Sequence, residues 1–98
     1  MNARGELLAG AEAAVNGDRN AQYGDPRQDF HRTAIMWSAY LGIQIEMHDV
    51  AALMALLKVS RIRWSPTKQD SWLDLAGYAA CGWDCAVALT ENQENQNG

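Results

Sequence analysis

The sequence has 98 residues, 48% of them hydrophobic and 20% charged, with a formal net charge of −4 at pH 7. This length allows one domain with one modest hydrophobic core. No apolar run approaches the ~20 residues that a membrane-spanning helix requires, and the net negative charge argues against a protein that wraps duplex DNA. We therefore expect a cytoplasmic protein with no membrane partner.

Two helices are predicted in the first half of the chain. The first covers residues 5–16, where leucine, alanine and valine recur at helical spacing before a glycine stop. The polar residues 18–25 are expected to form a loop. The second helix covers residues 26–41, with Asp25 as its N-cap, a proline in its first position, and Gly42 as its end.

Two further helices are predicted in the second half. Residues 48–63 are apolar around the whole helix circumference, which predicts a central helix buried on all sides. Pro66 ends it, because the residue before a proline disfavours helix. The last helix covers residues 69–89, and the polar residues 91–98 are expected to form a disordered tail. The chain is thus predicted to be all-α, about four helices packed as a small bundle in one domain, residues 1–90.

The cysteines and histidines do not suggest a metal site. Cys81 and Cys85 are four residues apart in an apolar helical pattern, which favours buried, reduced thiols. His31 and His48 are distant from them in the sequence. We therefore expect no metal ligands and no cofactor.

Charge is unevenly distributed. Residues 19–68 carry seven cations against four carboxylates, a local charge of +3 in an acidic protein. Lys58 and Arg61 lie near the end of the central helix, and Asp70 and Asp74 lie at the start of the next. A short connection between antiparallel helices would bring these ends together. Two readings stay open: internal salt bridges between the four side chains, or aspartates that hold the cations around a bound phosphate.

The polar segment after the first helix is a second candidate. Arg19 could bind a phosphate with two parallel hydrogen bonds, Tyr23 could stack on a base, and Gly24 would let the backbone approach a ligand. The alternative is a loop held by Tyr23 packing and the Asp25 cap. The predicted ligand site therefore comprises Arg19, Tyr23, Gly24, Lys58 and Arg61, supported by Asp25, Asp70, Asp74 and Tyr78, with no catalytic residue.

Four blocks of the sequence carry a resemblance. They are RNAQYGDP (19–26), WSAYLG (37–42), DVAALMALLKVSR (49–61) and DSWLDLAGYAA (70–80). In this order they resemble a family of small, uncharacterised proteins of tailed phages and prophages. The resemblance implies a phage setting, and hence the cytoplasm of an infected or prophage-carrying bacterium.

A more distant similarity is to the MazG-type all-α nucleoside triphosphate pyrophosphohydrolases. Those enzymes hold Mg²⁺ with two acidic pairs on neighbouring helices. Lys58 and Arg61 stand where one acidic pair would be sought. This departure suits direct contact between cations and phosphate, so Mg²⁺ is expected only if the chain is nevertheless a hydrolase.

Three functions remain open from the sequence. The first is non-catalytic binding of a nucleotide or other phosphorylated small molecule, as an anti-defence sponge that sequesters a host immune nucleotide signal. The second is a MazG-like pyrophosphohydrolase or an accessory to nucleotide modification. The third is a helical interaction protein in which Lys58 and Arg61 are purely structural. Four tryptophans and a nearly all-apolar helix also predict a homo-oligomer.

Overall fold

The computed structural model describes the backbone of residues 2–97 and their side chains except those of residues 18, 19 and 92–97. Within these residues there are five helices and no strands, so the all-α prediction is confirmed. The four longer helices correspond to the four that the sequence predicts. The helices are α1 (Ala3–Asn16), α2 (Asp18–Tyr23), α3 (Pro26–Leu41), α4 (Met47–Trp64) and α5 (Gln69–Asn97).

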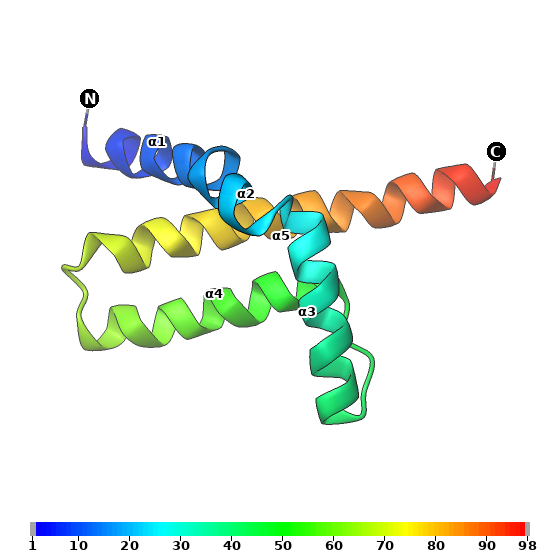
Figure 1. Cartoon of the computed structure of the whole chain (residues 1–98). Coiled ribbons are helices and arrows are strands. Elements are labelled where there is room, and N and C mark those ends of the chain that lie inside the picture. The colour runs from blue at the N-terminus through cyan, green and yellow to red at the C-terminus, as the bar shows by residue number, and fades with distance from the viewer. Residues whose placement is uncertain (1, 98) are drawn as a thin grey trace.

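An antiparallel pair of helices forms the frame of the molecule (Figure 1). Helices α4 and α5 lie side by side, joined by a short turn at one end. Helix α1 packs along the first half of α5, and α2 leads from it to α3. Helix α3 crosses the opposite end of the α4–α5 pair, and its C-terminal half projects beyond α4. None of the described helices is long and apolar enough to cross a membrane.

The helix ends follow local chemistry. The Asp25 carboxylate accepts a hydrogen bond from the Arg27 backbone N–H, as expected for the N-cap of α3. Gly42 ends α3 in the left-handed region at φ +71°, which a residue with a Cβ rarely adopts. At the start of α4, Glu46 and Asp49 form a reciprocal capping box that the sequence analysis did not predict.

Two predicted boundaries are wrong. Residues 18–23 form a short helix instead of part of a loop, because the Gly17 carbonyl accepts hydrogen bonds from the Asn20 and Ala21 backbone N–H groups. Helix α5 ends at Asn97 and not near residue 89, so the backbone of 91–97 continues the helix where a disordered tail was expected. Glutamate and glutamine are good helix formers, and no glycine or proline lies between Gly82 and Gly98. Residue 98 lies outside the described residues.

The core is small and lies where α3, α4 and α5 meet. Gly82 allows a close approach between α4 and α5, since a Cβ there would lie 3.0 Å from the Cβ of Ala51. Both cysteines are free thiols buried in this core, as predicted. The buried cluster consists of Phe30, Ala34, Val50, Ala51, Cys81 and Cys85.

Helix α4 is not buried on all sides, and that prediction is wrong. Val50 and Ala51 are its only buried side chains, and they face the core. Leu53 and Leu57 are each 42% exposed and Leu56 is 64% exposed. The reason is geometric: α5 covers one side of α4 and α3 covers one end, which leaves the outer face of α4 in solvent.

Candidate functional site

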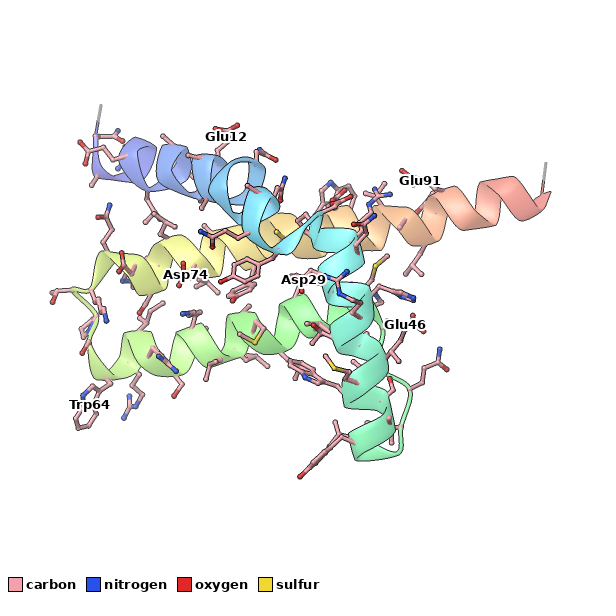
Figure 2. The ribbon with its side chains drawn as sticks, viewed as in Figure 1. Glu12, Asp29, Glu46, Trp64, Asp74 and Glu91 are labelled. Carbon is pink, nitrogen blue, oxygen red and sulfur yellow. The ribbon has the colours of Figure 1, made fainter. Side chains whose placement is uncertain are left out.

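A groove of about 540 Å³ lies at the α4–α5 turn. It is formed by the last turns of α4, the connecting residues and the first turns of α5. Figure 2 shows Asp74 on the side of α5 that faces α4, and Trp64 projecting from the end of α4. The groove is lined by Lys58, Ser60, Arg61, Trp64, Ser65, Lys68, Asp70, Ser71 and Asp74.

Backbone and side-chain hydrogen bonds hold the turn in place. The Ser65 backbone N–H donates to the Arg61 carbonyl at 2.9 Å and so closes α4. The indole N–H of Trp72 donates to the Pro66 carbonyl at 2.9 Å, which ties the turn to α5. Cations near the C-terminus of α4 and Asp70 in the first turn of α5 both suit the helix dipoles.

One of the expected salt bridges is present in the groove. Lys58 Nζ lies 2.9 Å from Asp74 Oδ2, with the lysine side chain 17% exposed and the aspartate 42% exposed. This pair joins α4 to α5, and it is one of the internal salt bridges among the four side chains that the sequence left open as an alternative to anion binding. No ion pair joins Arg61 to a carboxylate among the side chains that the structure describes.

The groove therefore contains more cations than it pairs. Within the described part of the chain, the Arg61 and Lys68 side chains form no ion pair, and neither does Asp70. The groove has three cations and two carboxylates among its lining residues, an excess of one positive charge. A cationic groove of this kind attracts an anion.

The other predicted ligand residues lie elsewhere. Tyr23 ends α2 with its side chain 56% exposed, and Gly24 follows at φ +85°. Neither residue lines the groove, and nor does Asp25. Arg19 lies in α2, but its side chain is outside those described. The structure therefore gives no support to a single site that combines this segment with Lys58 and Arg61.

Two supporting residues have structural positions. Asp25 caps α3 and also lines a separate hollow of about 280 Å³ beside Asn20 and Cys81. Tyr78 packs in the core with its ring centroid 6.3 Å from that of Phe30. Neither Asp25 nor Tyr78 reaches the groove, so only Asp70 and Asp74 of the predicted supporting residues do.

A second ionic cluster was not anticipated from the sequence. Arg27 of α3 lies 3.0 Å from Asp84 and 2.9 Å from Glu91, both on α5. Hydrogen bonds to Glu91 and then Asp84 raise the pKa of Arg27, and the guanidinium in turn lowers the pKa of Glu91. The i, i+7 spacing of the two carboxylates places them on one face of α5. That spacing is a signal in the sequence, but only the crossing of α3 over α5 supplies the cation.

Acidic and metal-binding side chains are dispersed. Among the residues whose side chains are described, no group of three or more His, Cys, Asp or Glu is placed to hold a metal ion. The polar side chains that line the groove are three cations, two carboxylates and three serine hydroxyl groups. Its lining is suited to an anionic ligand that makes direct hydrogen bonds to arginine and lysine.

Comparison with known proteins identifies the family. Residues 6–86 match the family described as a domain of unknown function, DUF6378. The chain belongs to this family. It is also similar to two proteins named Gene 55 protein, at 41% identity over 75 residues in Mycobacterium phage D29 and 40% over 74 residues in Mycobacterium phage L5. The resemblance to a family of phage proteins is therefore confirmed.

The extent of these matches bears on the site. They cover 76% and 74% of this chain, but 50% and 47% of the two phage proteins, so the chain spans about half the length of the curated relatives that it matches. No solved structure matches the chain. Every residue that lines the groove lies inside the family match of 6–86, whereas Glu91 of the second ionic cluster lies outside it.

Proposed function

We propose that the α4–α5 groove of this DUF6378 protein binds a nucleotide or a related phosphorylated small molecule without chemically altering it. The observation that carries the proposal is that Arg61 and Lys68 line the groove with no acidic partner among the described residues. Phosphate oxygens accept strong charge-assisted hydrogen bonds from such side chains. Lys58, held by Asp74, adds a third cation to the same groove.

Two further features favour a nucleotide over a bare phosphate. The groove volume of about 540 Å³ suits a ligand larger than an inorganic anion. The Trp64 side chain is 90% exposed beside the cations, so its ring is free to stack on a base. The Asp70 carboxylate, which pairs with no described cation, is available to accept a hydrogen bond from a sugar hydroxyl.

The phage relatives suggest a biological role for such binding. The two similar proteins are encoded by bacteriophages. A protein that binds a ligand without degrading it lowers the free concentration of that ligand by holding it in the bound state. We propose that the protein sequesters a nucleotide signal of the host defence and so acts as an anti-defence protein. The bound species would stay intact and would be recovered unchanged on denaturation.

The test is a binding screen with matched variants. Thermal unfolding is followed in the presence of inorganic pyrophosphate, nucleoside mono- and triphosphates, and cyclic dinucleotides, because a ligand specific for the folded state raises the melting temperature with its concentration. Arg61→Gln should abolish the shift. Arg63→Gln is the matched control, since Arg63 lies in the same last turn of α4 but does not line the groove.

The outcomes separate the three functions. A shift lost in Arg61→Gln and kept in Arg63→Gln supports the proposal. No shift with any member of the panel would favour the interaction protein in which the cations are structural. If the protein released pyrophosphate from a nucleoside triphosphate in the presence of Mg²⁺, and Arg61→Gln reduced this release, the function would be pyrophosphohydrolysis and not binding alone.

A further inference from the structure

The outer face of α4 and the projecting end of α3 are apolar and exposed. Of the fifteen large apolar side chains that are exposed among the described residues, ten come from residues 35–64. We call the following six the apolar face: Met36, Tyr40 and Leu41 of α3, with Leu53, Leu56 and Leu57 of α4. Tyr40 is 84% exposed and Leu56 is 64% exposed. So many exposed apolar side chains in one part of the chain are typical of a surface that contacts another protein.

The two helices that carry the apolar face meet at an angle (Figure 1). On α4, Leu53, Leu56 and Leu57 follow the i, i+3, i+4 spacing that makes one continuous ridge along a helix. Helix α3 crosses the N-terminal end of α4 and projects past it (Figure 1). A hollow of about 460 Å³ lies on this projecting part, lined by Met36, Trp37, Tyr40 and Leu41. A ridge on one helix and a hollow on the next are the two halves of a helix-packing contact.

The accessible surface area of the chain is larger than that of a compact monomer of the same mass. The isolated chain exposes 6953 Å², whereas a compact monomer of 10.8 kDa exposes about 5,500 Å². The radius of gyration is 14.9 Å, against about 13 Å for a compact chain of this length. Figure 1 shows that α5 extends beyond α3 with no other helix beside it. The surplus, about 1,400 Å², exceeds the roughly 800 Å² that each partner buries in a standard interface.

We propose that the apolar face is covered by a second copy of this chain in a two-fold symmetric dimer. The six residues of the face are uncharged, so the surface has no charge pattern that a partner of opposite charge would match. A two-fold contact requires only that the face fit itself, and the ridge of α4 with the hollow of α3 meets that requirement. The ridge on α4 of each copy packs into the hollow on α3 of the other copy. The groove at the α4–α5 turn lies at the end of the α4–α5 pair and stays accessible in this dimer.

Sedimentation velocity over a range of micromolar concentrations tests the proposal. The wild-type protein should sediment with twice the mass of one chain. Leu56→Glu places a charge on the ridge and should weaken the dimer by at least about tenfold. Leu8→Glu is the matched control, because Leu8 on α1 is 63% exposed but lies outside the apolar face, and it should leave the dimer unchanged.

A cross-linking experiment covers the case in which Leu56→Glu does not fold. Cys81 and Cys85 are buried, so a Leu56→Cys variant has a single accessible thiol, and a short bis-maleimide should join two copies through it. A Leu8→Cys variant should not be joined. A wild-type protein that stays monomeric at every concentration overturns the proposal, as does a dimer that Leu8→Glu dissociates and Leu56→Glu does not.

Discussion

Two ionic clusters join neighbouring helices to α5, and they differ in how completely their charges are matched. At the α3 crossing, the single cation Arg27 faces two carboxylates, and its Nε, Nη1 and Nη2 atoms all donate hydrogen bonds to them. At the α4–α5 turn, three cations face two carboxylates and only Lys58 is paired. The first cluster is closed, because its cation already has the acceptors that an anion would supply.

The difference shows that ion pairs and a ligand site can be built from the same residue types. A bidentate arginine held by two carboxylates fixes the angle between two helices. A groove that leaves an arginine and a lysine without a carboxylate keeps their donors available to an anion. The closed cluster should therefore govern stability and the open groove should govern binding. The following predictions test that division, from the largest expected effect to the smallest.

Removing the two unpaired cations should have the largest effect. In the double variant Arg61→Gln/Lys68→Gln, two charge-assisted hydrogen bonds to a bound anion are lost, which should weaken the affinity for inorganic pyrophosphate on the order of a hundredfold. Stability should change little, since both side chains lack a partner in the described structure. Isothermal titration calorimetry measures the affinity. Arg27→Gln should change it less than about twofold and should lower the melting temperature; equal losses of affinity in the two proteins would refute the division.

Neutralising the groove carboxylates should act in the opposite direction. Asp74→Asn releases Lys58 and removes a negative charge, so we expect pyrophosphate to bind about two- to threefold more tightly. The same change removes an ion pair and should cost about 1 kcal/mol of unfolding free energy. Asp70→Asn is the control: it should strengthen binding without the loss of stability, because Asp70 pairs with no described cation. Weaker binding in both variants would show that the carboxylates hold the ligand.

The closed cluster should make stability depend on acid pH. The pKa of Glu91 is lowered in the folded protein by the Arg27 guanidinium. Its contribution to stability is therefore fully present above its ordinary pKa near 4.5 and is lost as the pH falls through the lowered value. Denaturant midpoints measured between neutral and acid pH should fall less steeply for Glu91→Gln than for the wild type. Parallel curves for the two proteins would show that the pair contributes nothing.

The smallest effect concerns the thiol next to the closed cluster. Burial, and secondarily the negative charge of Asp84, raises the pKa of Cys85 to about 11. The thiol is therefore protonated near neutral pH, and iodoacetamide should modify it only after unfolding. Arg27→Gln should speed the reaction by loosening the α3–α5 contact, while Lys68→Gln should leave the rate unchanged. Equal rates of Cys85 modification in all three proteins would show that the α3–α5 contact does not control access to the core.

Features set by neighbouring residues were predictable. Four helix segments, the Asp25 cap, the Gly42 stop and the proline turn after α4 all follow from chemistry within a few residues. The short connection likewise brings Lys58 to Asp74, because antiparallel helices joined by a tight turn must pair their adjoining ends. The sequence thus placed Lys58, Arg61, Asp70 and Asp74 near one turn. The resemblance to a family of phage proteins was also correct.

Other features required the third dimension. Arg27 meets Asp84 and Glu91, 57 and 64 residues away, only because α3 crosses α5. Tyr23 and Gly24 were grouped with Lys58 by residue type, but the fold places them at the α2–α3 junction. The apolar circumference of α4 did not predict burial, since α5 and α3 cover only part of it.

The sequence by itself determined the four longer helices, most of their ends and the four charged side chains near the α4–α5 turn, because each depends on residues close along the chain. The tertiary structure alone decided which of those charges are paired and which face of α4 stays exposed. Both depend on where a distant helix lies, and the angle between packed helices is a property of their contact surfaces. For this reason Lys58 has a carboxylate partner, while Arg61, three residues further along the same helix, has none among the described residues.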